Sequence, residues 1–184
     1  MAKLIFHVSM SLDGFFEDAN GSFDWGAPSE EVHAFVNGLQ EGIGIYLFGR
    51  RNYETMAVWD DPNAFPGATP ATLEYADIWR QIDKVVYSTT LTSVTTARTH
   101  LERTFDPAAI KKMKAESQHD IGIGGPTLGA HAFAAGLIDE VSLFVVPIVL
   151  GAGKPALQHP VALDLLDEHR FDSGTVYLRY RTNS

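Results

Sequence analysis

The sequence predicts one α/β domain with a mostly parallel central sheet, helices on both faces of that sheet, and an antiparallel hairpin at its C-terminal end. Short apolar runs that are typical of buried strands alternate with stretches of helical periodicity along most of the chain. The segments on either side of Ser173-Gly174 have the pattern of two strands joined by a tight turn. The 184 residues, 45% of them hydrophobic, suffice for one core, so residues 1–184 are expected to form a single domain.

Strands are expected where apolar residues alternate or run together between turn-forming residues. The sheet is expected to contain Lys3–Met10, Ile43–Phe48, Lys84–Ser88, Asp120–Gly124 and Glu140–Val149, and the hairpin to pair His169–Asp172 with Thr175–Arg181. Pro147 has no N–H to donate, which places the strand Glu140–Val149 at an edge or a bulge. Ser11–Trp25 is expected to be a long loop with a turn at Asn20-Gly21.

Helices are expected where a capping residue precedes apolar residues that are three or four positions apart. Pro28 stands in the first turn of a helix that continues to about Leu39, with Val32, Phe35 and Val36 on one face. The other helices are expected from Arg50 to about Val58, from Ala71 to Ile82, from Pro107 after the N-cap Asp106 to about Ser117, and from Pro126 to about Gly136. The stretch that follows the strand Lys84–Ser88, as far as Phe105, is expected to be irregular.

Composition argues against several classes of partner. With 14 Lys and Arg against 23 Asp and Glu, the formal charge of −9 disfavours binding to nucleic acid or to an anionic membrane. There is no cysteine, which excludes disulfides and thiolate chemistry and fits the cytoplasm. The apolar runs are too short to span a membrane, and the seven histidines show no metal-ligand spacing. We expect a soluble cytoplasmic protein that binds a small molecule and no metal.

Three strand ends carry residues that suit an anionic ligand, because ligands of such sheets bind beyond the carboxyl ends of the strands. The first is Phe48 to Tyr53, where Arg50 and Arg51 stand in the opening turn of a helix. The helix dipole disfavours cations there by about 0.3–1 kcal/mol each, a penalty that a bound phosphate would reverse. Two solvated arginines at a tolerated position explain the same pattern equally well.

The other two strand ends offer hydroxyl and backbone donors. Ser88, Thr89 and Thr90 leave a buried strand together, as donors to phosphate or ribose or simply as a turn cap. Gly124-Gly125, followed by a helix, lets the backbone approach a ligand and expose successive N–H groups, although a tight turn alone has the same sequence. The chain has no Rossmann fingerprint, no phosphate-binding loop of the NTPase type and no G-x-S-x-G elbow.

Taken in order, these strand ends, the first strand and the Ser11-Leu12-Asp13-Gly14 turn resemble the dihydrofolate reductase-like superfamily. The chain is similar above all to stand-alone relatives of the RibD C-terminal domain, the reductase domain of riboflavin biosynthesis. The resemblance extends nearly end to end through LFGRRNYE, VVYSTTL, IGIGGPTL and GLIDEVSLFVVPIVLGAGKP. It implies a dihydrofolate reductase-like three-layer fold, an NADPH-dependent oxidoreductase and a homodimer joined near the C-terminal edge strands, for which the apolar run Leu143–Leu150 gives physical support.

The resemblance also implies where NADPH binds. In such proteins the Gly-Arg and Ser-Thr segments hold the phosphates and the adenosine end of the cofactor, and the Gly-Gly turn cradles the pyrophosphate. By position, the implied cofactor-binding residues are Gly49, Arg50, Arg51, Ser88, Thr89, Gly124, Gly125, Pro126, Thr127 and Leu128.

A proton donor is implied in the same way. Dihydrofolate reductases can place a carboxylate five residues after a loop tryptophan with a proline between them, and Trp25, Pro28 and Glu30 repeat this spacing. A partly buried carboxyl with a raised pKa would supply or relay the proton that a reduced C=N group needs. Glu30 is therefore the first predicted catalytic residue and Asp13 the second, although without the resemblance Glu30 is explained as an acid at a helix N-terminus. Trp25, Phe48 and Tyr53 are expected to form aromatic walls around the substrate.

Departures from the family pattern argue against folate itself. Asn52 stands where dihydrofolate reductases have threonine after the Gly-Arg pair, and Gly129 replaces a tyrosine. The leading hypothesis is a reductase that transfers a hydride from NADPH to a small pterin- or pyrimidine-like heterocycle. A nucleotide-binding regulatory module of the same fold without turnover is the alternative, and a hydrolase of an anionic ester that uses Asp13 and a histidine is a third hypothesis.

Overall fold

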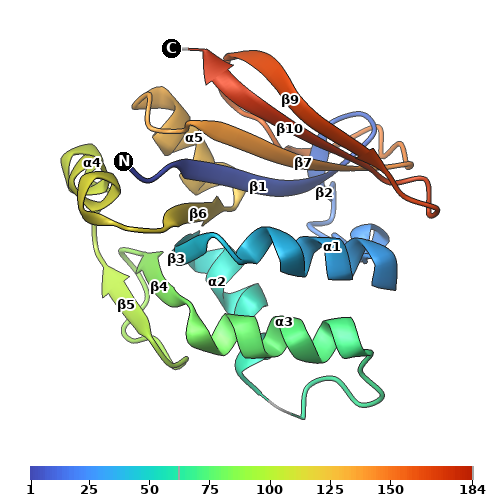
Figure 1. Cartoon of the computed structure of the whole chain (residues 1–184), viewed down its shortest axis with the longest axis horizontal. Helices are drawn as coiled ribbons and strands as arrows, with labels where there is room; N and C mark the ends of the chain where they lie inside the picture. Colours follow the sequence, from blue (N-terminus) through green and yellow to red (C-terminus); the bar gives the residue numbers. More distant parts are fainter. Residues whose placement is uncertain (62, 184) are drawn as a thin grey trace.

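A computed structural model describes residues 1–61 and 63–183. Its central sheet has eight strands in the order β5-β4-β3-β6-β1-β7-β10-β9 (Figure 1). The strands are β1 Leu4–Ser11, β3 Ile43–Gly49, β4 Asp83–Tyr87, β5 Thr99–Glu102, β6 Asp120–Gly124, β7 Glu140–Val146, β9 Ala162–Arg170 and β10 Val176–Asn183. The strands from β5 to β7 are parallel, whereas β10 is antiparallel to both β7 and β9. The predicted mostly parallel sheet with a C-terminal antiparallel hairpin is confirmed, although the first strand of the hairpin is Ala162–Arg170 and not His169–Asp172.

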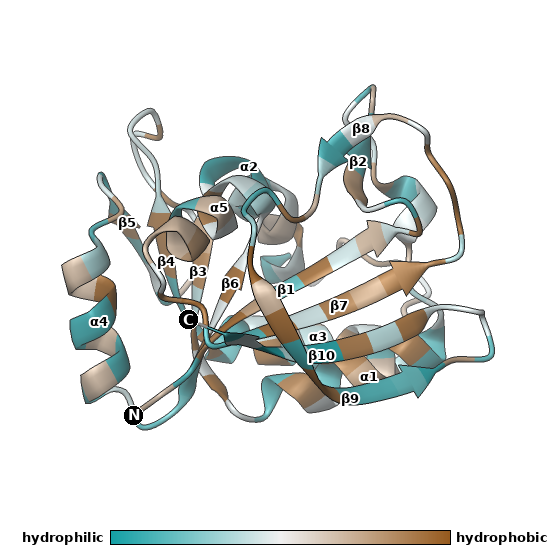
Figure 2. Cartoon of the chain, turned by 90° about the horizontal axis from the view of Figure 1, so that it is seen from above, coloured by the Kyte–Doolittle hydropathy of each residue, from teal (hydrophilic) through white to brown (hydrophobic). Residues whose placement is uncertain are grey.

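Helices pack against both faces of this sheet, as predicted. The helices are α1 Glu30–Gln40, α2 Arg50–Met56, α3 Pro70–Gln81, α4 Pro107–Glu116 and α5 Pro126–Ala134, with short 3-10 turns at η1 Asp24–Gly26 and η2 Ala57–Asp60. In β7, Leu143 packs in a core shared with α4 and α5, while its neighbour Phe144 packs against α1. This two-sided burial explains why β7 is mainly hydrophobic in Figure 2. Among the described residues, none of the helices has the length and apolar character that crossing a bilayer requires.

Three short strands lie where the sequence predicted no strand. β2 Phe15–Asp18 and β8 Gly153–Pro155 form a separate two-stranded sheet (Figure 2), so the predicted loop Ser11–Trp25 contains a strand and the 3-10 turn η1. β5 lies within the stretch expected to be irregular. These strands have three or four residues and little apolar alternation, which leaves periodicity with too few positions to detect them.

The prediction that Pro147 places its strand at an edge or bulge is wrong. β7 lies between β1 and β10, and it ends at Val146, one residue before the proline. Pro147 therefore ends a central strand instead of interrupting an edge strand.

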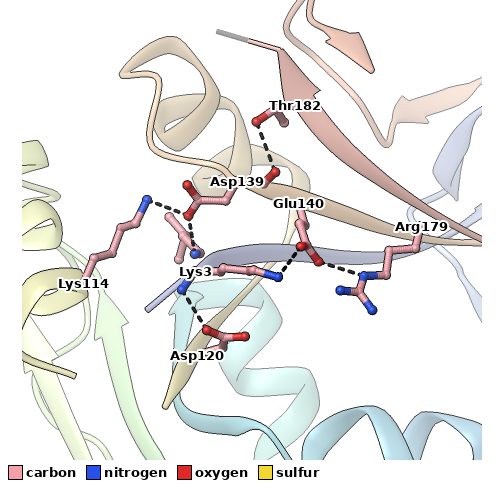
Figure 3. A network of polar contacts seen from close by, with 8 residues as sticks. Lys3, Lys114, Asp120, Asp139, Glu140, Arg179 and Thr182 are labelled. Atoms are coloured by element: carbon pink, nitrogen blue, oxygen red, sulfur yellow. Dashed lines mark hydrogen bonds and ion pairs between the residues drawn. The ribbon is translucent and has the colours of Figure 1, made fainter. Parts of the chain in front are cut away.

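A network of charged residues fastens the sheet at the N-terminal ends of its parallel strands (Figure 3). Glu140 accepts hydrogen bonds from Lys3 Nζ at 2.6 Å and from Arg179 Nε at 2.8 Å, so that it joins β1, β7 and β10. Asp139 accepts from Lys114 Nζ of α4 at 2.6 Å and from the backbone N–H of Leu4. The network lies at the end of the parallel strands opposite to the turns in which ligand contacts were predicted.

Candidate active site

The three predicted strand ends meet at one edge of the sheet. β4, β3 and β6 are neighbours and run parallel, so their carboxyl ends point the same way. In the register, Gly49 pairs with Tyr87 of β4, and Phe48 pairs with Gly124 of β6. The turns after these residues therefore stand side by side.

Arg50 links the first of these turns to the second. Its Nη1 atom donates to Thr90 Oγ1 at 2.9 Å, and its Nε atom donates to Glu54 Oε1 at 2.9 Å within α2. About half of the Arg50 side chain remains exposed. Arg51 points further outward, with its side chain 80% exposed and its Nη1 3.9 Å from Glu17 Oε1. Both cations are accessible to an anion at this edge.

Arg103 adds a third cation that the sequence analysis missed. It directly follows β5, and its Nη1 atom donates to the carbonyl oxygens of Ser88 and Leu91 in the second turn. The strand β5 pairs with β4, which brings Arg103 to the edge that carries Arg50. The position of Arg103 directly after a strand would have marked it as a candidate, but β5 was not predicted.

Ser88 acts within the protein as a turn cap. Its side chain is buried, and its Oγ atom accepts from the backbone N–H groups of Thr90 and Leu91 at 3.2 and 3.0 Å. Thr89, next to it, is exposed. Of the two, Thr89 is the residue with a hydroxyl open to a ligand, whereas Ser88 fixes the shape of the turn.

The Gly124-Gly125 turn has the shape that close approach of a ligand requires. Gly125 has a φ of 90°, which favours glycine, and it precedes α5 without any side-chain cap. The N–H groups of Thr127 and Leu128 in the first turn of α5 are therefore free of capping side chains, while Pro126 has no N–H to offer. An ideal Cβ atom on Gly124 would lie 2.6 Å from Asn52 Nδ2, so α2 closes directly over this turn.

Gly49 and Leu128 bring the first and third turns into contact. An ideal Cβ on Gly49 would lie 3.8 Å from the Cβ of Leu128, whose side chain is buried. Gly129, which follows, is required by packing, because a Cβ there would lie 2.4 Å from the ring of Phe6. Of the predicted cofactor residues, Arg50, Arg51, Thr89 and Thr127 are exposed at this edge, and the others shape the turns that carry them.

A pocket of about 260 Å³ lies at the ends of the neighbouring strands β1 and β7. It is bounded by Ser9, Phe144 and Val146 of the sheet and by α1, the end of α2, η2 and α3. The remaining lining residues are Gly26, Ala27, Pro28, Val32, His33, Val36, Met56, Trp59, Tyr75 and Thr175. Its volume lies just below the usual range for small-molecule sites, and its walls are mostly apolar with a few polar groups.

His33, Trp59 and Tyr75 form an aromatic wall of this pocket. The His33 ring lies 5.6 Å from that of Trp59 in an edge arrangement and 5.5 Å from that of Tyr75. Burial lowers the pKa of His33, which the charge of Glu74 partly opposes, and burial raises the pKa of Tyr75. Both side chains are therefore neutral at pH 7. The sequence analysis missed all three residues, because nothing in their local pattern distinguishes a pocket wall from a core.

The predicted aromatic walls lie elsewhere. Phe48 is 3% exposed and stacks on Tyr46, and Tyr53 is 3% exposed with its hydroxyl bonded to Thr95 and Thr96. Both belong to the core, so the expectation that they contact a substrate does not fit their burial. Trp25 is half-buried before the pocket residues Gly26 and Ala27, with its Nε1 donating to Ser22 O at 3.1 Å.

Neither predicted proton donor is a buried carboxyl. Glu30 is exposed at the start of α1, where Ser29 caps the helix. Asp13 accepts from Ser11 Oγ at 2.7 Å and from the N–H groups of Leu150 and Gly151 at 3.1 and 2.7 Å. The hydrogen bond from Ser11 is the first cause that lowers the pKa of Asp13, so this side chain is held as an anion that fixes a turn. The expectation of a raised pKa is wrong for Asp13. Within residues 1–61 and 63–183, no cluster of three possible metal ligands is found.

Comparisons with known proteins agree with this architecture. The model of the RibD C-terminal domain matches residues 2–177. The uncharacterized protein YyaP of Bacillus subtilis (strain 168) is 26% identical over 188 residues, which cover 98% of this chain and 95% of that protein.

Two solved structures share the fold over nearly their whole length. A putative riboflavin biosynthesis protein from Shewanella sp. PV-4 has a TM-score of 0.76 at 22% identity, with 100% of both chains covered. A dihydrofolate reductase from Enterococcus faecalis, solved in a complex with NADP(H), has a TM-score of 0.62 at 12% identity, covering 99% of this chain and 97% of the enzyme. The predicted dihydrofolate reductase-like fold is confirmed.

Proposed function

Because the chain belongs to the RibD C-terminal domain family, we propose that it is an NADPH-dependent reductase of a small pterin- or pyrimidine-like heterocycle. One observation carries the proposal: three turns with anion-binding chemistry stand side by side at the carboxyl ends of β4, β3 and β6.

The residues at this edge fit a dinucleotide. Arg50 and Arg103 both contact the turn after β4, where they would hold the phosphate on the adenosine side. Arg51, whose Nη1 lies 3.9 Å from Glu17 Oε1 of β2, adds positive charge to the same edge. The uncapped N–H groups of Thr127 and Leu128 at the N-terminus of α5, which follows Gly125 with its φ of 90°, suit a pyrophosphate. NADPH, when bound, would supply the hydride.

The pocket lies where a substrate would meet the far end of such a cofactor. β6 and β1 are neighbours, and Gly124 pairs with His7 only two residues before Ser9, which lines the pocket. A cofactor that follows the edge from β4 to β6 would reach the mouth of the pocket at the end of β1. The apolar walls would exclude water from the reacting ring.

We propose Glu30 as a proton relay at the mouth of the pocket. It is exposed, and it stands between Pro28 and Val32, which both line the cavity. Glu30 can therefore take a proton from solvent and pass it to a bound ligand through water. Asp13, fixed by its three hydrogen bonds, is assigned to positioning the turn after β1.

We also propose a homodimer joined at β9. This strand is the last of the sheet and has an unpaired edge, and it exposes Leu165 and Leu166 by 53% and 42%. Such an edge is a ready surface for pairing with a second copy. Leu143 and Phe144 do not contribute, because both are buried inside the chain.

Titration of the protein with NADPH, followed by its fluorescence, tests the proposal. Saturable binding in the micromolar range is expected, and NADPH oxidation is expected with at least one member of a panel of pterins, pyrimidines and quinones. If no binding saturates up to low-millimolar NADPH, the cofactor assignment fails. Saturable binding without oxidation of any acceptor would instead indicate a nucleotide-binding module.

A further inference from the structure

The pocket beside β1 and β7 is lined without any full charge. Among the described residues that form its walls there is no Asp, Glu, Lys or Arg. The nearest acidic side chains on α1, Glu30 and Glu31, are exposed, and Glu31 Oε2 accepts from the Asp172 N–H at 3.1 Å, outside the lining. A negatively charged group buried in this pocket would thus lose its water without gaining a cationic partner from the walls, and the charge of Glu74, which acts on His33, would repel it. Such burial costs several kcal/mol.

The aromatic wall offers flat surfaces and a few polar atoms, among them the ring nitrogens of His33. Trp59 packs between Phe65 at 4.3 Å and Tyr75 at 4.7 Å, so its ring is held in place. The His33 ring, beside both Trp59 and Tyr75, makes no side-chain hydrogen bond within the described part of the chain. A ligand can therefore use a ring nitrogen of His33 without displacing a protein contact.

We propose that this pocket takes an uncharged, flat ring system of one or two fused rings, and that His33 orients that ring through one hydrogen bond. The inference rests on the proposed function, since it names the substrate class of the same reductase site. It excludes substrates that bury a phosphate or another ionised group in this pocket. The volume of about 260 Å³ suits a ring system of this size.

The test compares two probes with the same ring system. 1,4-Naphthoquinone is neutral, and 1,4-naphthoquinone-2-sulfonate adds one negative charge to it. The chain has no cysteine, so the quinone will not modify a thiol. By calorimetry without any cofactor, the neutral probe is expected to bind in the micromolar range and the sulfonate at least tenfold more weakly. Because the net charge of −9 repels anions generally, the comparison is repeated at high salt, where the difference should persist.

Two variants test the role of His33. His33→Phe keeps an aromatic ring without a polar atom. It is expected to raise the Kd for naphthoquinone about fivefold, which corresponds to the loss of one neutral hydrogen bond. His33→Gln keeps a donor and an acceptor and should restore most of the affinity. His100→Phe, on the exposed face of β5, is the matched control and should change nothing.

Three results would overturn the inference. These are tighter or equal binding of the sulfonate at high salt, no binding of the neutral probe, or unchanged affinity in His33→Phe. The NADPH titration is read separately, because these measurements contain no cofactor. A protein that binds naphthoquinone but not NADPH would contradict the reductase proposal and leave the pocket assignment intact.

Discussion

His7, in the middle of β1, has a buried Nε2 atom without a hydrogen-bond partner among the described residues. Burial, reinforced by the charge of Arg179 and partly opposed by Glu140, lowers the pKa of His7 from 6.5 to about 4. In the register, His7 pairs with Ser142 of β7, which in turn pairs with Arg179 of β10. The histidine is thus a neutral part of the sheet, and its protonation opposes folding.

The pH dependence of stability should reveal this histidine. Between pH 6.5 and about 4 the unfolded chain binds a proton at His7 that the folded chain does not, so the free energy of unfolding should fall as the pH falls through this range. The full loss from this residue is about 3 kcal/mol. Urea unfolding at pH 7 and pH 4.5 should show a smaller pH effect in His7→Leu than in the parent protein.

The exposed His100 provides the control, since His100→Gln should keep the parent pH dependence. An undiminished pH effect in His7→Leu would contradict the assignment. Some dependence should remain in this variant, because burial lowers the pKa of His33 in the same direction.

Arg50 should contribute to cofactor affinity. A hydrogen bond to a charged group is worth about 1.5–3 kcal/mol, so Arg50→Gln is expected to raise the Kd for NADPH at least about tenfold, with less effect at high salt. Arg80→Gln removes a partly exposed arginine that pairs with Asp77 on α3, and it should leave the Kd unchanged. Equal effects of the two substitutions would mean that only the overall charge matters.

At the scale of elements, substitutions of the glycines at the two ends of α5 distinguish an effect on stability from an effect on binding. Gly125 precedes the helix with a φ of 90°, and Gly136 follows it with a φ of 62°. Alanine at either position should cost about 1–2 kcal/mol in the free energy of unfolding, because both require the left-handed region. Only Gly125→Ala should also weaken NADPH binding, because Gly125 lies in the turn proposed to hold the pyrophosphate, whereas Gly136 lies at the opposite end of α5. Equal NADPH affinities of the two variants, measured by fluorescence titration, would argue against the predicted pyrophosphate cradle.

Long elements with strong periodicity could be predicted from the sequence, and short polar ones could not. Helix α1 begins at Glu30 after its cap Ser29 and ends at Gln40, close to the predicted Pro28 to Leu39. The Thr99–Glu102 strand has alternating partial burial in an edge strand with only one partner, so no apolar run marks it in the sequence. Arg103 was not identified from the sequence for the same reason, because it is recognised as a strand-end residue only when β5 is known.

Side-chain burial within the site was also beyond sequence reasoning. The strand-end pattern placed Arg50 and Gly125 correctly at one edge, because parallel topology alone brings such turns together. Whether Tyr53 faces a ligand or the core, and whether Trp59 lines a pocket, depends on how α2 and α3 pack over the sheet. That packing is a property of the whole fold, not of a local segment.

At the scale of the whole molecule, the open edge at β9 predicts the state of association. Light scattering should give twice the chain mass of 20.2 kDa. The double substitution Leu165→Lys and Leu166→Lys places charges on the edge strand and should shift the protein to monomers. Leu73→Lys, at an equally exposed leucine on α3, should leave the mass unchanged. A parent protein of 20.2 kDa at all concentrations would contradict the dimer.

The charged network around Glu140 has a consequence for how this scaffold can diversify. It fastens β1, β7 and β10 at the end of the parallel strands opposite to the turns proposed to bind the cofactor, so the folded state draws part of its stability from residues outside the proposed site. Substitutions in the strand-end turns that alter specificity are therefore separate from substitutions in the charged network that lower stability. The strand-end turns can therefore accept substitutions for a different ligand while the charged network keeps the sheet stable.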